Sequence, residues 1–526
     1  MTDDRRHDVV IVGGGHNGLT CATYLARAGF DVAVVEARET VGGCASTLDM
    51  LGGARVNVCN CDHSLIRGTG VIEELDLAAH GLQYLELDPA QIMAPWDGSP
   101  PWMLFRDVDR TLQSLAHSRP KQVEAYRRYV DELTPAAELV LEMMAGPPRV
   151  GSVARRLARR RGRGVSALLR LSRSSCADVL ARYFDDASLL SGASTTGPAV
   201  WGLPPQTPGT GLGALGYVLR HISPVGRPVG GSGVLTDALA RALLAAGGTI
   251  LTGTRVRTIH SSGGRATGVT LDTGVRLDAR AVVATGDPRA TFVDLLETPP
   301  APARKMVGRW ASAPGGEGYE SKLDAVVDHP PRLLGLTPEH VAAVGTGPET
   351  GTTLVMTPTM QELQAVSTWT ARGEVPALPP MLANTPSVLD PSVAGQTAPH
   401  VFSLEVLFTP YALRGGWEQT TEPQRWLELF AQRVEPGFLE GIRETQLTGP
   451  VEYERDFSMP RGYAPSFAGG PLSALFGRQK ELTRYRTDLP GLYLSGAGTF
   501  PGAGVSGAPG RNAAGEILRD LRAATA

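Results

Sequence analysis

The sequence predicts an α/β protein in which a parallel β-sheet covered by helices is interleaved with a second, α+β domain. Short apolar strands that end in glycine occur in three distant blocks, near residues 9–18, 281–286 and 492–498. Apolar residues at helical spacing follow the first and the last block, and two long insertions separate the three blocks from one another. Because parallel strands bring their carboxyl ends to one edge of a sheet, we expect the three blocks to converge on a single ligand.

The first block indicates a dinucleotide-binding turn. The β-branched run Val9 to Val12 is followed by Gly13, Gly15 and Gly18 in the spacing GxGxxG, and apolar residues then recur at helical spacing over 19–28. In this motif the first glycine makes the tight turn, and the second lets the backbone approach a pyrophosphate. The third lets the helix pack on the strand, with the helix N-terminus facing the phosphates.

An acidic residue restricts the ligand of this turn. The apolar run Val32 to Val35 ends in Glu36, which is therefore expected at the tip of the next parallel strand. Its carboxylate would accept hydrogen bonds from ribose hydroxyls and would repel a 2′-phosphate. The sequence thus predicts FAD or NAD rather than NADP.

The central block predicts further strands of the same sheet. A glycine turn leads to an amphipathic helix over about 235–246, and a β-hairpin then turns at 272–274. The block ends in a buried strand that finishes in small residues, 281–286. Val256 lies where a backbone amide and carbonyl can pair with an adenine edge.

The last block favours a long dinucleotide. The strand Leu492 to Leu494 leads into a glycine-rich loop and a final helix that begins near 506–511. Such a loop presents backbone amides and a positive helix end to an anionic group. Because a simple NAD site needs only one glycine-edged strand end and this chain has three, we expect FAD.

Composition excludes several classes of protein. The 526 residues are 42% hydrophobic and 20% charged, typical of a globular chain with two or three domains. The net charge of −3 suggests no nucleic-acid partner. The charged N-terminus runs directly into the first strand, and no stretch approaches the ~18 apolar residues of a membrane helix. We expect a cytoplasmic protein.

The cysteines predict neither disulfides nor a metal. They are Cys21, Cys44, Cys59, Cys61 and Cys176. Five cysteines in so long a chain form no disulfide framework, and Cys44 has no partner at the spacing of a redox pair. The segment Cys59-x-Cys61, followed by Asp62 and His63, could suggest a metal, but metal-binding cysteines usually come with a second pair, and none exists here.

The chain resembles the phytoene desaturase (carotenoid desaturase) superfamily of FAD-dependent oxidoreductases, especially its bacterial phytoene-dehydrogenase-like members. The motifs that carry the resemblance are "VVEARETVGGCAST", "PVGGSGVLTDALA", "AVVATGDPRATFVDLL", "TPSVLDPSVAG" and "GAGTFPGAGVSGAPGRNAA". It covers nearly the whole chain. It implies a glutathione-reductase-type FAD-binding Rossmann domain interleaved with a substrate domain, non-covalent FAD, and redox chemistry on long apolar polyenes.

The resemblance also implies the cofactor contacts. Carried over onto this sequence, they are Gly13, Gly15, Gly18, Glu36, Arg38, Gly43, Val256, Gly496 and Gly498. Residues beside these motifs complete the expected FAD site: Asn17, Ala37, Cys44, Ala45, Thr285, Gly286, Gly504, Val505 and Ser506.

The two insertions divide the chain into five segments. The FAD domain is expected over 7–95, 226–300 and 451–526, and the substrate domain over 96–225 and 301–450. The first insertion is helical and rich in arginine, and the second mixes strands with proline-rich loops. Together they would build an apolar tunnel over the flavin. A second GxGxxG, at 211–216, follows no strand and is interpreted as a loop.

An arginine-rich stretch has two interpretations. Residues 149–173 contain nine arginines and no acid, interleaved with apolar residues. This pattern is typical of an interfacial helix that takes a lipophilic substrate from the inner face of a membrane. It also fits a solvated basic helix or a mobile loop, and Gly162 and Gly164 interrupt it.

The catalytic prediction concerns the segment "NVCNCDH". Relatives commonly have a plain apolar segment there, and a histidine where this chain has Phe500. Both positions are expected near the flavin, so His63 and Asp62 are candidates for proton transfer. The alternative is a buried His63 that only hydrogen-bonds. Tyr411, Trp417 and Tyr463 are interpreted as tunnel or core aromatics.

These patterns predict hydride transfer to or from a long apolar polyene. The expected reaction is desaturation, or reductive cyclisation as in bacterial polycyclic tetramate macrolactam pathways. The alternatives are a carotenoid desaturase and a non-catalytic flavin-binding assembly protein. NADPH or oxygen is the expected redox partner, and a quinone stays open, as does the oligomeric state. The Ala-, Arg- and Gly-rich composition is typical of a high-GC bacterium.

Overall fold

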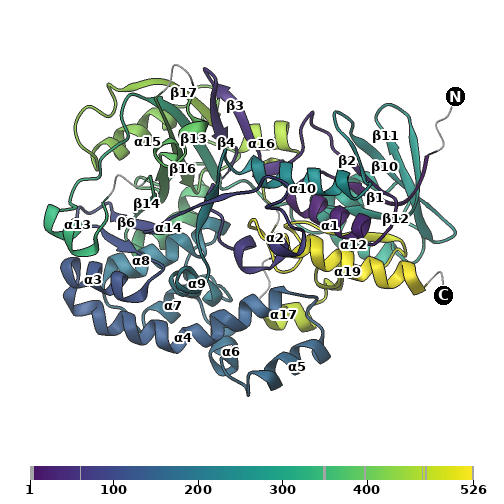
Figure 1. Cartoon of the computed structure of the whole chain (residues 1–526), viewed down its shortest axis with the longest axis horizontal. Helices are drawn as coiled ribbons and strands as arrows, with labels where there is room; N and C mark the ends of the chain where they lie inside the picture. Colours follow the sequence, from purple (N-terminus) through teal and green to yellow (C-terminus); the bar gives the residue numbers. More distant parts are fainter. Residues whose placement is uncertain are drawn as a thin grey trace.

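The computed structural model describes residues 5–59, 61–347, 351–395, 399–464, 466–467 and 471–523. Two seven-stranded sheets organise this part of the chain, and they lie toward opposite ends of an elongated molecule (Figure 1). The chain passes between the two several times, because each sheet contains strands that are distant in sequence. The α/β fold class is therefore confirmed.

The first sheet brings the three glycine-edged blocks together. Its order is β10-β11-β12-β1-β2-β9, with β18 also paired to β12. The strands are β1 (Arg5–Val12), β2 (Val32–Val35), β9 (Thr249–Leu251), β10 (Val256–Ser262), β11 (Arg265–Leu271), β12 (Arg276–Ala284) and β18 (Leu492–Leu494). Val12 lies opposite Val35 and Ala284, and Ala284 lies opposite Leu494. The parallel strands therefore end at one level, as the sequence predicts.

Three helices cover one face of this sheet. They are α1 (His16–Arg27), α10 (Gly233–Ala245) and α19 (Ala508–Ala523), and they lie side by side in Figure 1. A Cβ on Gly510 would lie 2.2 Å from the Asn17 carbonyl, so glycine is what lets α19 approach α1 this closely. The other face packs against α12 (Arg304–Ala311), with Phe292 and Met306 buried in that core.

The second sheet has the order β17-β13-β16-β15-β14-β6-β7. Its strands are β6 (Gln91–Pro95), β7 (Trp102–Leu104), β13 (Glu320–Val327), β14 (Thr353–Thr357), β15 (Met381–Asn384), β16 (His400–Leu407) and β17 (Ile442–Thr448). All neighbours are antiparallel except β6 and β14. Strand β6 thus belongs to this sheet, although the sequence placed residues up to 95 in the FAD domain. Its apolar run carries no signal that would tell the two sheets apart.

The two faces of the second sheet differ in polarity. On β13, Leu323, Ala325 and Val327 point into an apolar core shared with α15 (Glu422–Ala431). Because successive side chains on a strand point to opposite faces, Glu320, Lys322 and Asp324 share the other face. That polar face is turned toward the cavity described below.

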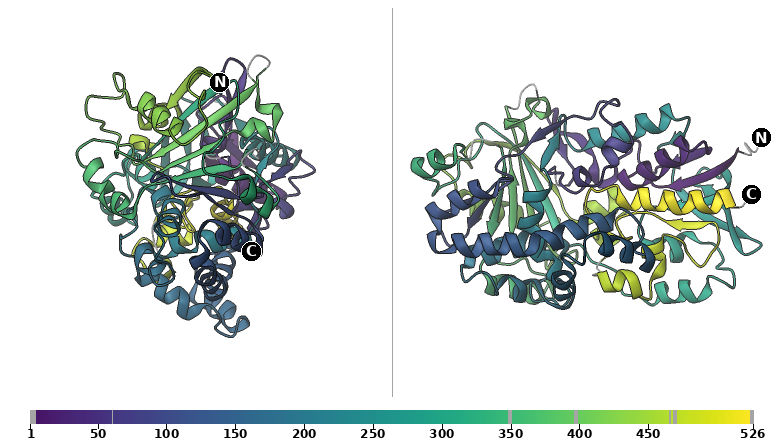
Figure 2. Two further views of the ribbon diagram at one scale, coloured as in Figure 1. Left: turned by 90° about the vertical axis from the view of Figure 1, so that its left-hand side faces the viewer. Right: turned by 60° about the horizontal axis from the view of Figure 1, so that its bottom comes forward.

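A helical layer packs beneath the second sheet, as the side view shows (Figure 2). It contains α3 (Val108–Ser118), α4 (Val123–Met144), α6 (Val165–Arg173), α7 (Cys176–Leu180), α8 (Ala187–Thr196) and α9 (Gly216–Ile222). Residues 211–215 form a 3₁₀ turn that runs into α9, so the second GxGxxG is not the loop that its sequence context indicated. It follows no strand, as expected.

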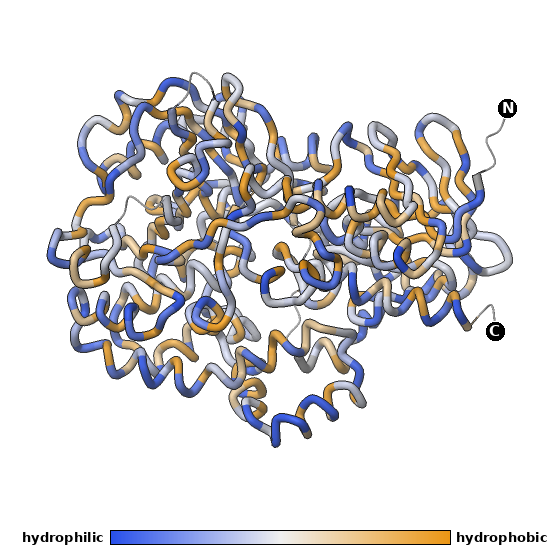
Figure 3. The backbone as a smooth tube through the Cα atoms, in the orientation of Figure 1, coloured by the Kyte–Doolittle hydropathy of each residue, from blue (hydrophilic) through white to orange (hydrophobic). Residues whose placement is uncertain are grey.

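The arginine-rich stretch forms an arm of two helices, α5 (Val150–Arg159) and α6, at the lower edge of the molecule in Figure 1, with α6 packed against α4. Gly164 separates them with φ +82°, and a Cβ there would lie 2.4 Å from the Pro135 carbonyl oxygen. Hydrophilic residues are prominent along α5, whereas α6 is largely apolar (Figure 3).

Small elements complete the described fold. Two-stranded sheets pair β3 (Thr47–Leu51) with β4 (Ala54–Asn57), and β5 (Tyr84–Glu86) with β8 (Gly226–Pro228). The remaining helices are α2 (Val71–Glu74), α11 (Pro288–Ala290), α13 (Pro338–Val344), α14 (Met360–Thr370), α16 (Pro450–Phe457), α17 (Pro471–Phe476) and α18 (Lys480–Arg484). Among the described residues, no helix has both the length and the apolar character needed to cross a bilayer.

Candidate active site

A cavity of about 870 Å³ lies where the carboxyl ends of the parallel strands face the second sheet. It is lined by the glycine turn after β1, the helical layer, and the polar face of β13 and β16. A different hollow, of about 1130 Å³, lies at the other end of the first sheet beside Arg265, Arg486 and Tyr493. None of the predicted cofactor or catalytic residues lines it. The first cavity is therefore the candidate site.

The glycine turn opens into this cavity. Gly13 has φ +105°, and a Cβ there would lie 2.5 Å from the Thr285 hydroxyl, so the turn needs glycine for its own packing. Gly15 differs, since a Cβ there would meet no protein atom closer than 4.0 Å. The space beside Gly15 is open, which is what a closely approaching ligand requires.

Glu36 organises the loop next to that turn. Its carboxylate accepts hydrogen bonds from the backbone N–H of Gly14 (2.7 Å) and of Arg38 (2.9 Å). The side chain is buried and still lines the cavity. An acid at the tip of β2 therefore faces the site, as the sequence predicts, and it also holds two segments of the turn together.

Most of the predicted cofactor residues meet at this cavity. Those that line it are Gly13, Gly15, Asn17, Gly18, Glu36, Ala37, Arg38, Gly43, Cys44, Ala45, Val256, Thr285, Gly286, Gly504 and Val505. Three others, Gly496, Gly498 and Ser506, are not among the lining residues. A Cβ on Gly496 would lie 2.2 Å from the Thr285 carbonyl oxygen, so this glycine serves strand packing. The Ser506 hydroxyl accepts from the Ala508 N–H at the start of α19.

Buried polar atoms in the cavity lack partners within the described chain. They are Nε2 of His16, Oδ1 of Asn17, Oε1 of Gln91 and Nε of Arg220. A buried polar group without a hydrogen bond costs about 1–3 kcal/mol, so such atoms usually face a ligand or water. Burial lowers the pKa of His16 to about 4, so its imidazole is neutral near pH 7. Together with the glycine turn and Glu36, these atoms fit a bound dinucleotide.

Comparison with known proteins identifies the family. The model of the flavin-containing amine oxidoreductases matches residues 18–314, more than half of the chain. The chain belongs to this family. It is therefore a flavin-dependent oxidoreductase, and the cavity is its candidate flavin site, shortened below to flavin site.

Curated relatives and solved structures agree with this assignment. "Pyridine nucleotide-disulfide oxidoreductase domain-containing protein 2" of Rattus norvegicus is 28% identical over 98% of this chain and 94% of its own length. The lycopene-forming phytoene desaturase of Pantoea ananas is 25% identical over 97% of this chain and 99% of its own. The structure of a putrescine oxidase bound to putrescine matches with a TM-score of 0.61 and 17% identity, over 98% and 99% of the two chains. The resemblance to carotenoid desaturases is thereby confirmed.

His63 lines the flavin site, but both of its ring nitrogens have partners. Nδ1 lies 2.9 Å from the Tyr84 hydroxyl and Nε2 lies 3.0 Å from the Ser232 hydroxyl. Burial, together with the nearby His16, lowers the pKa of His63 to about 3, so the ring is neutral at neutral pH. These contacts match the alternative of a hydrogen-bonded structural histidine, and proton transfer by His63 stays a prediction.

Asp62 also lines the flavin site, and it is strongly paired. Its carboxylate accepts from Nε of Arg227 (2.6 Å) and from the Thr353 hydroxyl (2.6 Å). Burial alone would raise the pKa of Asp62, but the Arg227 guanidinium and these hydrogen bonds hold it below the ordinary value. A carboxylate stabilised in this way is a weak base. Asp62 therefore connects the two domains, and its role in proton transfer also stays a prediction.

Phe500, which was expected near the flavin, is not among the residues that line the flavin site. Phe500 is buried in an apolar cluster with Leu139 and Met143, and its ring lies 6.0 Å from that of Phe467. Trp417 packs on Trp426, and Tyr463 packs on Tyr319. None of the three predicted aromatics, Tyr411 included, lines the cavity. In the described ranges, no three His, Cys, Asp or Glu side chains are grouped to hold a metal.

Sequence reasoning missed the polar wall of the flavin site. Glu320 and Lys322 of β13 and Glu405 of β16 line the cavity. The Lys322 ammonium donates to the carboxylate of Asp324 and to the Ser403 hydroxyl. Burial raises the pKa of Glu405 to about 7 although Lys322 opposes this, and burial and Glu405 raise the pKa of Glu320 well above its usual value.

A sequence signal for this wall exists. The run "YESKLDAVV" places a charged residue at every second position, Glu320, Lys322 and Asp324, as a strand with one charged face does. The expected tunnel is therefore apolar only in part. Its apolar wall comes from the helical layer and the segments that join it: Val140, Leu141, Val200, Trp201, Leu212, Leu215 and Leu219.

Proposed function

We propose that this protein uses FAD to transfer hydride to or from a large, mostly apolar substrate, as in the desaturation or reductive cyclisation of a polyene. The observation that carries the proposal is a single cavity whose one end is the dinucleotide turn and whose other end has the apolar wall of the helical layer. When bound there, FAD supplies the hydride acceptor or donor. The chain's own contribution is to orient the substrate and to exclude water.

Two features refine the substrate class. Similarity to a phytoene desaturase over nearly the full length of both chains supports a polyene. The carboxyl and ammonium groups on the sheet wall would be poorly matched by a pure hydrocarbon, because buried polar groups need hydrogen-bonding partners. They favour a polyene that also carries polar groups over a carotenoid. NADPH, a quinone or oxygen would complete the cycle.

The test is anaerobic bleaching of the bound flavin. Purified holoenzyme is mixed with phytoene in detergent micelles, with a lipid extract of the source cells, or with NADPH, and absorbance in the flavin bands is followed. We expect bleaching by NADPH if the enzyme is a reductase, and by phytoene or the extract if it is a desaturase. A putrescine arm tests amine oxidation, which the cavity carboxyls Glu320 and Glu405 would also suit. Bleaching by putrescine alone would contradict the proposal.

A flavoprotein that bleaches with none of these reagents would support the non-catalytic alternative. The control is the same protein bleached by dithionite, which shows that the flavin can be reduced at all. Denaturation of the protein should release FAD as an intact molecule, since we expect it to be bound without a covalent link.

We further propose that the arm formed by α5 and α6 contacts an anionic membrane at its cytoplasmic face. Six of its arginines are exposed and form no ion pair with any described residue: Arg155, Arg159, Arg161, Arg163, Arg170 and Arg173. Val150 is 62% exposed and Leu169 is 39% exposed on the same arm. Exposed arginines beside exposed apolar side chains are the features of an interfacial helix. This contact would give a lipophilic substrate a short path to the cavity.

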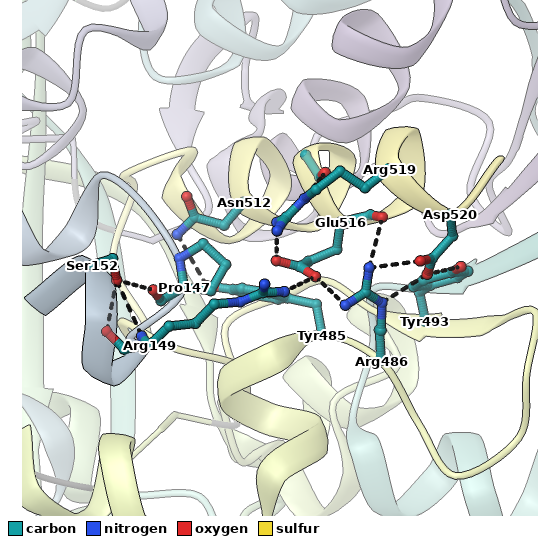
Figure 4. Close-up of polar contacts among 11 residues, drawn as sticks. Pro147, Arg149, Ser152, Tyr485, Arg486, Tyr493, Asn512, Glu516, Arg519 and Asp520 are labelled. Carbon is teal, nitrogen blue, oxygen red and sulfur yellow. Dashed lines mark hydrogen bonds and ion pairs between the residues drawn. The ribbon is translucent and has the colours of Figure 1, made fainter. Parts of the chain in front are cut away.

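The arm is fixed at its base. Figure 4 shows Arg149, which precedes α5, reaching the fully buried carboxylate of Glu516 on α19 at 2.5 Å. The same carboxylate pairs with Arg486 at 2.6 Å and with Arg519. Nearby, the Asn512 side chain donates to the Met144 carbonyl at the end of α4. A displacement of α5 on a membrane would therefore act directly on α19, the helix that packs on the first sheet.

A further inference from the structure

We propose that Glu405, with Glu320 beside it, is the general base and acid of the flavin reaction: it takes the proton that the substrate loses in dehydrogenation, or returns it in reduction. The proposal rests on the proposed function, because it assigns a residue to the proton that accompanies the hydride. Three observations support it: the placement of the two carboxyl groups, the groups around them, and the hydrogen bonds and ion pair that already hold Asp62 and His63.

Strand register places both carboxyl groups on the cavity face. Lys322 of β13 lies directly opposite Glu405 of β16, and Glu320 is two residues before Lys322 on the same face. On the other side of Glu405, Leu382 of β15 is its register partner and also lines the cavity. The pair therefore lies within the sheet wall, surrounded by other cavity residues.

No side-chain hydrogen bond joins either carboxyl group to another residue of the described chain, and both line the open cavity. The charged or titratable groups that face Glu405 and Glu320 are Lys322 on the same sheet, Asp62 and Cys59 after β4, Cys44 before β3, and Tyr319 and Tyr453. The cation among them, Lys322, is held by Asp324 and Ser403. With so little compensation, a charge on one carboxyl group makes a charge on the other less favourable, so they titrate in separate steps.

The alternative acids and bases of the site are less suited. Asp62 is neutralised by Arg227, and His63 has hydrogen-bonding partners at both ring nitrogens. Glu405 has neither constraint, and its pKa near 7 matches what efficient general acid–base catalysis requires. Burial and the neighbouring Glu405 raise the pKa of Glu320 well above its usual value, so a charge on one carboxyl group opposes a charge on the other.

The step balances in atoms and electrons. In dehydrogenation, one C–H bond breaks with its electron pair as hydride, which goes to oxidised FAD. The neighbouring C–H bond breaks as a proton, which goes to the Glu405 carboxylate, and the electron pair of that bond forms the new C=C bond. Glu405 then releases its proton to solvent. In the reductive direction, hydride leaves reduced FAD and the Glu405 carboxyl group donates the proton to the adjacent carbon.

The first experiment needs no substrate. Difference infrared spectra of the FAD holoenzyme, recorded against pH, report protonated carboxyl groups directly. Wild type should show one carboxyl ionisation near pH 7 and a second at higher pH. Glu405→Gln should lose the first ionisation, and the second should move to lower pH because the neighbouring charge is gone. Glu320→Gln should keep the first and lose the second. Glu444 of β17 is exposed, and Glu444→Gln is the matched control, which should leave both ionisations unchanged.

The second experiment tests catalysis with the reagent that bleaches the flavin. Glu405→Gln should slow bleaching about 10²–10⁴-fold, the usual contribution of a general acid or base, with unchanged FAD content. The wild-type rate should follow one ionisation near pH 7 that this variant lacks. No carboxyl ionisation between pH 6 and 8, or an unchanged bleaching rate in Glu405→Gln, overturns the proposal. If the infrared result holds but no polyene, extract or NADPH bleaches the flavin, the proposed function fails instead.

Discussion

His63 shows how a single buried side chain makes the stability of this protein depend on pH. Its imidazole is neutral in the folded protein because burial lowers its pKa from 6.5 to about 3. In the unfolded chain it binds a proton below pH 6.5. Since the unfolded state then binds more protons than the folded state, the free energy of unfolding falls as the pH drops from 6.5 toward 3.

We predict that His63→Gln removes this part of the pH dependence. The amide can still bond to Tyr84 and Ser232, but it does not titrate. Between pH 6.5 and pH 5 the wild type should lose about 2 kcal/mol more than the variant, since one pKa unit corresponds to about 1.4 kcal/mol. Urea unfolding at the two pH values measures the difference, with the exposed His329→Gln as control. If the free energy of unfolding depends on pH in the same way in wild type and in His63→Gln, the ring takes up its proton in the folded state as readily as in the unfolded chain, which contradicts the prediction.

At the scale of elements, the α5–α6 arm makes a prediction about membranes. Replacing Arg155, Arg159, Arg161 and Arg163 by glutamine should release the protein from vesicles that contain phosphatidylserine. Each basic residue near an anionic surface contributes about 1 kcal/mol, so the partition coefficient should fall roughly 10³-fold. Co-sedimentation at low and high salt measures it, because salt screens this attraction in the parent protein.

The matched control removes as many exposed basic residues elsewhere: Arg257, Lys305, Arg332 and Arg372. It should sediment like the parent. Equal release of both variants would show that net charge alone matters, and equal retention would leave only a solvated basic arm. FAD content should be the same in all three proteins, because the arm contributes no residue between 149 and 173 to the flavin site.

Elements differ in how well the sequence predicts them. The turn after β1, the hairpin that turns at 272–274 and the strand β18 follow from local patterns, and the structure has all of them. The polar wall was missed because its meaning depends on register. Only when β13 pairs with β16 do Lys322 and Glu405 become neighbours, and no local pattern shows this. The packing partners of Phe500, Leu139 and Met143, could not be predicted for a similar reason, since they belong to a helix that is distant in the sequence.

At the scale of the molecule, FAD should bind the folded state, because the residues expected to hold it come from segments that are distant in the sequence and meet only on folding. A ligand that binds only the folded state stabilises it by about 2.7 kcal/mol at 100 times its dissociation constant. We predict that added FAD raises the Tm of the apoprotein and that Glu36→Ala reduces this increase. The substitution removes a charged acceptor that contributes about 1.5–3 kcal/mol.

Differential scanning calorimetry with and without FAD measures the shift, and Asp31→Ala, just before β2, is the control. A Tm that rises with NAD and is unaffected by FAD would contradict the choice of cofactor. An equal rise in wild type and Glu36→Ala would show that Glu36 serves only the backbone N–H groups of Gly14 and Arg38.

The interleaved strands have a consequence for synthesis on the ribosome. The first sheet begins with β1 at Arg5, but β18 and α19, which complete it, lie at 492–494 and 508–523. Gly504 and Val505, which line the flavin site, also come from this last stretch. A nascent chain therefore lacks part of the nucleotide site until these residues have been synthesised. The cavity that FAD is proposed to occupy is therefore complete only once the chain has been made at least as far as Val505.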